Sequence, residues 1–157
     1  NGIVQGMRPI IGYNYGAGES SRVKSTIRYS LLTAAGLMLT GTILALALPK
    51  QILALFDADA ALMSAGVTAL RIISLGFLVS SVGLIYSGVF EAIGNGRNSL
   101  IISLLRQFVI TIPLSFILTR FFGPTGVWIS FPVGELCASA AAFCLLKKYQ
   151  NGAFSPL

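Results

Sequence analysis

Charged residues and histidine are scarce in this sequence. Asp, Glu, Lys and Arg make up only 10% of the 157 residues, and histidine does not occur, whereas an average soluble domain is about 25% charged. The two cysteines, Cys137 and Cys144, lie seven positions apart. On a helix this separation is about 10 Å, too far for a disulfide, whose Cα atoms lie within about 7 Å of each other. With no histidine and so few thiols, we expect no metal site and no cofactor.

Motifs for catalysis and for phosphate binding are also missing. The sequence has no nucleophile elbow and no close pair of acids inside an apolar stretch. The glycine-rich run PIIGYNYGAGESSRVK, residues 9–24, fits neither G-x-x-x-x-G-K-[ST] nor G-x-G-x-x-G, because Ala17 and Ser21 stand where those patterns need glycine. No basic stripe with interleaved aromatic residues occurs outside the apolar stretches. We therefore expect no catalytic residues, no enzyme activity and no nucleic-acid partner.

Apolar residues, by contrast, are abundant. They make up 55% of the chain, and the mean hydropathy is +0.82. A helix needs roughly 20 apolar residues to cross about 30 Å of hydrocarbon, and four stretches reach or approach that length. They are residues 29–48, 72–90, 100–119 and 127–146. The sequence predicts an all-α, polytopic membrane helix bundle surrounded by membrane lipid.

The remaining segments are expected to flank or connect these four spans. Residues 1–18 resemble the end of a truncated transmembrane helix, because the apolar run is too short to cross alone. Residues 49–71 are typical of an interfacial turn followed by a helix, with Asp57 or Asp59 as its N-cap. Eight of the eleven Lys and Arg residues fall on one predicted side of the membrane. Because positive residues are retained in the cytoplasm, we expect a cytoplasmic loop at 19–28 and a cytoplasmic tail at 147–157.

Small and polar residues recur at helical spacing inside the spans. The fourth span carries a small residue at every fourth position: Gly126, Ser130, Gly134, Ala138 and Ala142. Helices in membranes approach closely along such ridges, which predicts that this helix packs against protein. The third span carries a polar stripe with the same period: Ser103, Gln107, Thr111, Ser115 and Thr119. These side chains either bond to neighbouring helices and their own carbonyls or line a water-filled pathway. Pro113 in the same span favours a kink.

Two charged residues lie inside the predicted spans. Arg106 is about a third of the way into the third span, and Glu135 is near the middle of the fourth. A charge in the membrane is costly, so it marks a pathway, a proton relay or a buried pair. Glu135 is either a protonatable or cation-binding carboxylate in a central cavity or a structural partner of Arg106 or of the backbone near Pro132. Together with Gln107, Thr111 and Ser115, these two residues are the candidates for a substrate or ion pathway.

Four segments in order resemble the successive signatures of the C-terminal half of multidrug and toxic compound extrusion (MATE) transporters. They are GMRPIIGYNYGAGESSRVK at 6–24, LPKQILALF at 48–56, EAIGNGRNSLIISLLRQ at 91–107 and GPTGVWISFPVGE at 123–135. The resemblance implies a partial C-terminal lobe of a twelve-helix, two-lobe transporter, comprising the end of the eighth helix and helices nine to twelve. The missing N-terminal lobe of the same chain is then its partner.

The family exports cationic amphipathic organic compounds, drugs and toxins among them, by proton- or sodium-coupled antiport. The resemblance thus implies small organic cations as substrates and an integral protein of the bacterial cytoplasmic (inner) membrane, with the C-terminus in the cytoplasm. One branch of the family has an acidic residue in the middle of the tenth helix, where this sequence has Leu84, Ile85 and Tyr86. The coupling H⁺ or Na⁺ is then expected to bind in the N-terminal lobe.

Two other functions fit a bundle of this kind. A lipid-linked oligosaccharide flippase of related fold would have more cationic residues facing its cavity than the single Arg106 of the third span. A membrane scaffold subunit would need no alternating access and would move no substrate. Ion-dependent substrate movement distinguishes the antiporter from the scaffold.

Overall fold

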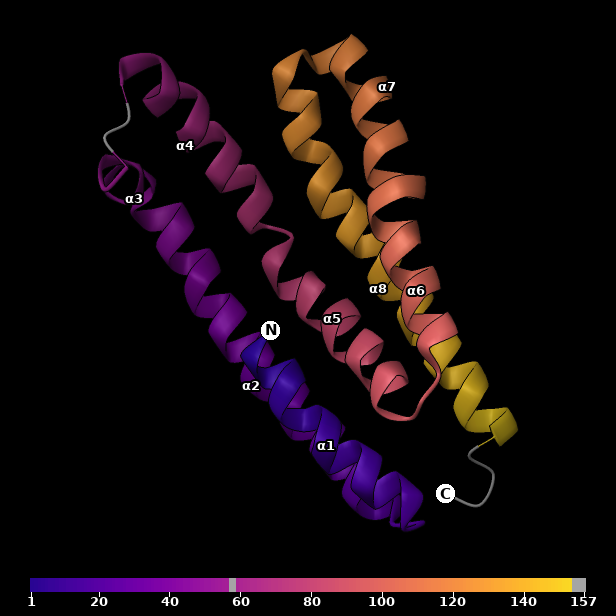
Figure 1. The fold of residues 1–157 in the computed structure, drawn as a ribbon. Coiled ribbons are helices and arrows are strands. Elements are labelled where there is room, and N and C mark those ends of the chain that lie inside the picture. Colours follow the sequence, from indigo (N-terminus) through magenta and orange to yellow (C-terminus); the bar gives the residue numbers. More distant parts are fainter. Residues whose placement is uncertain (57–58, 154–157) are drawn as a thin grey trace.

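The structure is a computed structural model that describes residues 1–56 and 59–153, and within that part of the chain the regular structure is helical (Figure 1). The helices are α1 (Gly2–Gly16), α2 (Ser20–Ala47), α3 (Pro49–Ala54), α4 (Ala60–Ser74), α5 (Phe77–Ala92), α6 (Gly96–Leu104), the π-helix η1 (Leu105–Thr111), α7 (Ile112–Phe122) and α8 (Pro124–Ala153). In Figure 1, α1 lies along the first half of α2, and α6, η1 and α7 form one long rod beside α8. The predicted all-α bundle is confirmed.

The described residues contain three helices that are long and apolar enough to cross a membrane: 20–47, 96–122 and 124–149. Helices α4 and α5 meet the same test only as a pair, which is bent by 54° at its break. Large apolar side chains such as Leu37, Phe108 and Phe116 are 62%, 62% and 75% exposed on these helices. Outward-facing apolar groups are what a lipid-embedded bundle presents to hydrocarbon. If the bent pair is counted as one span, length and composition allow up to four spans among the described residues.

The ends of the spans differ from the predicted boundaries. Residues 20–28, expected as a loop, are the first turns of α2, and residues 147–153, expected as a tail, are the last turns of α8. Val23 and Ile27 are buried one helical turn apart against α1, while the neighbouring cations Arg22, Lys24 and Arg28 are exposed. Tyr149 stacks edge-on against Phe90, with 6.0 Å between ring centroids. The first extension is an amphipathic helix, which an apolar-length criterion cannot detect.

The turns and caps follow local chemistry. Gly18 adopts φ +74° between α1 and α2, a conformation that favours glycine. The predicted turn and helix after the first span are present as α3 and α4. Asp59 is the N-cap of α4 and accepts a 2.7 Å hydrogen bond from the Leu62 N–H, as one of the two capping predictions stated. The other candidate cap, Asp57, lies outside the described residues.

Pro113 lies in the first turn of α7, directly after the π-helix. A proline in a helix lacks a backbone N–H, and its ring crowds the carbonyl four residues earlier, so the preceding turn widens. The sharp bend falls elsewhere, between Ser74 and Phe77. There Gly76 is so close to α8 that a Cβ atom would lie 3.0 Å from the Cα of Pro132.

The small residues mark the closest helix contacts, as predicted for the fourth span. Ser130, Ala138 and Ala142 are buried on α8. A Cβ on Gly126 would collide with the Leu118 carbonyl group of α7. A core of apolar residues from α1, α2, α5, α6 and α8 then fills one half of the bundle. Its largest fully buried side chains are Ile11, Val23, Ile85, Val89 and Phe90.

Candidate functional site

Arg106 and Glu135, the two charged residues expected inside the spans, lie together. Arg106 is on η1 and Glu135 is on α8, and Arg106 Nη1 lies 3.7 Å from Glu135 Oε2. Their side chains are only 27% and 23% exposed. This distance is that of an ion pair and not of a hydrogen bond. Within the described residues, Glu135 Oε2 is buried and accepts no hydrogen bond. The carboxylate is therefore paired in charge but not fully satisfied in hydrogen bonding.

The π-helix is what places Arg106 beside α8. Thr111 donates a 2.6 Å hydrogen bond from Oγ1 to the carbonyl of Arg106, five residues earlier, across the widened turn. On the facing helix, a Cβ on Gly134 would collide with that same Thr111 hydroxyl. Glycine at 134 thus lets α8 contact the widened turn directly, and the next residue, Glu135, reaches Arg106. Thr111 has a structural role in holding this turn.

Of the other polar residues of the third span, Ser103 lines the same cavity as Arg106, whereas Gln107, Ser115 and Thr119 do not gather around the ion pair. Ser115 donates to the Ile112 carbonyl at 2.7 Å, and Thr119 donates to the Ser115 carbonyl at 2.6 Å. Both line a separate hollow of about 290 Å³ next to Arg120. Gln107 is exposed. Of the five predicted pathway residues, the structure brings together Arg106, Thr111 and Glu135 and leaves Gln107 and Ser115 outside the group.

Each partner of the ion pair lines its own cavity. Glu135 lines an apolar cavity of about 330 Å³, together with Ile73, Gly76 and Phe77 from the break between α4 and α5. Arg106 lines a more polar cavity of about 190 Å³, which lies between α1, α5 and α6. The pair therefore lies where the two cavities approach each other, next to both interrupted helices, η1 and the bent α4–α5 pair.

A second ion pair shares the polar cavity with Arg106. Arg8 of α1 pairs with Glu91 of α5, and Glu91 Oε1 accepts a 2.7 Å hydrogen bond from the Ser99 hydroxyl. The Ser87 and Ser99 hydroxyl oxygens lie 2.8 Å apart in the same chain of polar groups. Sequence reasoning missed this pair because Arg8 and Glu91 are far apart in the chain and both lie outside the four predicted spans. Two arginines and one glutamate leave the polar cavity with an excess of positive charge.

Three comparisons connect this geometry to known proteins. The family model MatE matches residues 1–117. The chain is 28% identical over 141 residues to the multidrug export protein MepA of Staphylococcus saprophyticus, and 30% identical to the MepA of Staphylococcus aureus strain RF122; each match covers 89% of this chain and 31% of the relative. Among solved structures, the MATE multidrug transporter DinF-BH in complex with R6G is 33% identical and matches with a TM-score of 0.86, covering 96% of this chain and 34% of that one. The chain thus spans about a third of the length of these relatives.

Proposed function

Because the chain belongs to the MATE family, we propose that it is part of a multidrug efflux transporter that exports cationic amphipathic organic compounds in exchange for inward-moving H⁺ or Na⁺. The observation that carries this proposal is the 28–30% identity with multidrug export proteins over 89% of the chain. In this proposal an N-terminal lobe, which the sequence does not contain, supplies the opposing half of the transport pathway and the principal coupling carboxylate.

The interrupted helices support a pathway near Glu135. Transporters built from repeats place substrate and ion sites near the bilayer midplane, where discontinuous helices meet. Here the break between α4 and α5 and the π-helix both lie beside the Arg106–Glu135 pair. Helix α5 carries no acid at positions 84–86, so Glu135 is the acid best placed in this part of the chain to influence coupling. We assign it a secondary role, because Arg106 already neutralises part of its charge.

Transport by the whole transporter tests the proposal. Proteoliposomes that contain it should expel a fluorescent organic cation when an inward proton or sodium gradient is imposed. Efflux should stop when both gradients are collapsed, because antiport has no other energy source in this system. Liposomes without protein are the control for leakage. Efflux that continues after both gradients are collapsed would reject antiport, and no protein-dependent movement at all would favour a scaffold.

The same proposal includes an orientation in the bacterial cytoplasmic (inner) membrane. In Figure 1 the start of α2, the α5–α6 connection and the end of α8 lie at one end of the bundle. Helix α3, the start of α4 and the α7–α8 turn lie at the other end. The end that holds the start of α2 and the end of α8 carries most of the Lys and Arg residues. By the positive-inside rule this end faces the cytoplasm, and the C-terminus lies there too.

Single-cysteine labelling should confirm this orientation. In a cysteine-free background, Ser21→Cys should react with an impermeant maleimide only from the cytoplasmic side. Ala60→Cys and Thr125→Cys should react only from the outside, because they begin the helices that follow the two turns at the opposite end. Right-side-out and inverted vesicles provide the two directions of access. The reverse labelling pattern would overturn the orientation.

A further inference from the structure

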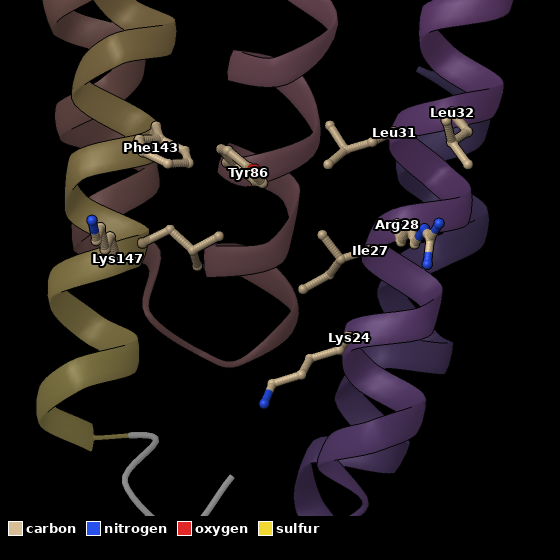
Figure 2. A pocket seen from close by; sticks show the side chains of 9 residues that line it. Lys24, Ile27, Arg28, Leu31, Leu32, Tyr86, Phe143 and Lys147 are labelled. Carbon is tan, nitrogen blue, oxygen red and sulfur yellow. The ribbon is translucent and has the colours of Figure 1, made fainter.

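A groove of about 510 Å³ opens between α2, α5 and α8, away from the Arg106–Glu135 pair (Figure 2). Its floor is apolar and aromatic. Tyr86 of α5 and Phe143 of α8 lie side by side, with 6.3 Å between ring centroids. Ile27 and Leu31 point toward them from α2 in Figure 2. Such a floor accommodates a hydrocarbon chain.

The rim of the groove is cationic. Lys24 and Arg28 come from the first turns of α2, and Lys147 comes from the last turns of α8. All three residues are exposed, and none of the described residues that line the groove is acidic. Arg28 lies eight residues after the start of α2, about 12 Å along the helix, so positive charge extends beside the apolar floor and not only beyond it. The groove therefore combines an apolar surface with concentrated positive charge.

This combination selects against the compounds that the transporter is proposed to export. An organic cation in the groove would face the like charges of Arg28 and Lys147, and none of the described residues that line the groove is acidic. An anionic amphiphile has the complementary pattern, because its head group meets the cations while its tail covers Tyr86, Phe143 and Leu31. At the cytoplasmic end of a membrane bundle, the abundant molecules with that chemistry are anionic phospholipids.

We propose that this groove is a binding site for an anionic phospholipid of the cytoplasmic leaflet. The phosphate lies between Arg28 and Lys147, with Lys24 at the open end, and one acyl chain lies on the aromatic floor. Because α2 and α8 contribute opposite walls, a bound lipid joins the two helices at the end of the bundle where α1 also packs. Lipid binding in this groove is distinct from drug export and does not depend on the coupling ion.

Competition between two lipids tests the site. The purified transporter, exchanged into mixed micelles of phosphatidylglycerol and phosphatidylcholine, is analysed by native mass spectrometry for the lipids that it retains. The wild type should retain phosphatidylglycerol preferentially. The double variant Arg28→Gln/Lys147→Gln should lose about 30-fold of this preference, because each Lys or Arg near an anionic lipid contributes about 1 kcal/mol and tenfold corresponds to about 1.4 kcal/mol. The charge-retaining variant Arg28→Lys/Lys147→Arg should keep most of it.

A matched control separates this groove from general surface charge. The variant Arg22→Gln/Lys148→Gln removes the same two charges from the same two helices at the same end, yet neither residue lines the groove. It should keep the phosphatidylglycerol preference. Equal loss in both double variants would overturn the site in favour of diffuse attraction. Equal retention of both lipids by the wild type, or full displacement of phosphatidylglycerol by inorganic phosphate, would also overturn it.

Discussion

Substitution of Gly126 by leucine should destabilise the bundle more than any single charge change, by about 3 kcal/mol or more. A Cβ atom at this position would collide with the carbonyl carbon and oxygen of Leu118 and lie 2.6 Å from the Thr119 amide nitrogen. These are backbone atoms of α7, so no side-chain rotation relieves the contact. The turn at Gly123, with φ +58°, holds the start of α8 directly beside the end of α7. The two helices must separate to admit a larger residue.

Gly36 provides the control for this experiment. It is also a glycine inside a long helix, α2, but it is exposed and a Cβ there would meet nothing within 4 Å. Gly36→Leu should leave stability unchanged or raise it by up to about 1 kcal/mol, since leucine forms helix better than glycine. Thermal unfolding of the purified transporter in detergent compares the two variants. If both unfold at the wild-type temperature, α7 and α8 do not approach as closely as the structure shows.

The features that sequence reasoning predicted correctly depend on local composition. Long apolar runs predict membrane spans because a helix must be long enough to cross the hydrocarbon layer. The small residue at every fourth position from Gly126 to Ala142 predicts a contact face because helix backbones approach closely only where the side chains are small. Asp59 was a predictable cap because its side chain bonds within the next turn. The pairing of Arg106 with Glu135 was predictable because an isolated charge in a membrane is costly. Each prediction follows from a constraint that acts on a few neighbouring residues or on a single charge.

The features that sequence reasoning missed depend on contacts between distant segments. Residues 20–28 are helical because Val23 and Ile27 meet α1, and an apolar-length criterion stops where the cations begin. The Arg8–Glu91 pair joins α1 to α5, and no spacing pattern in the sequence predicts it. Sequence reasoning did not predict the π-helix either. Pro113 predicted a disturbance in the third span, but the position of the widened turn depends on how Gly134 of α8 packs against Thr111.

The Arg106–Glu135 pair should show strong energetic coupling. Removing one partner of a fully buried pair costs about 3–5 kcal/mol because the other charge is left unpaired. Here the side chains are 27% and 23% exposed, so we expect a smaller loss, about 1–3 kcal/mol for Arg106→Gln or Glu135→Gln alone. The double variant leaves neither charge in the membrane and should be less destabilised than the sum of the two single variants. Thermal unfolding of the four proteins in detergent completes the double-mutant cycle.

Arg120 supplies the matched control for the double-mutant cycle. It is an arginine of the same rod, but it lines the hollow beside Ser115 and not the Glu135 cavity. Arg120→Gln and Glu135→Gln should therefore be additive, since sites without shared contacts add within about 0.5 kcal/mol. In proteoliposomes, Glu135→Gln should slow gradient-driven efflux only partly, because the principal coupling carboxylate is proposed to lie in the other lobe. Additivity of Arg106→Gln with Glu135→Gln would show that the two charges do not interact. Complete loss of efflux in a Glu135→Gln protein that is still folded at the assay temperature would make Glu135 the principal coupling carboxylate, in place of an acidic residue in the N-terminal lobe.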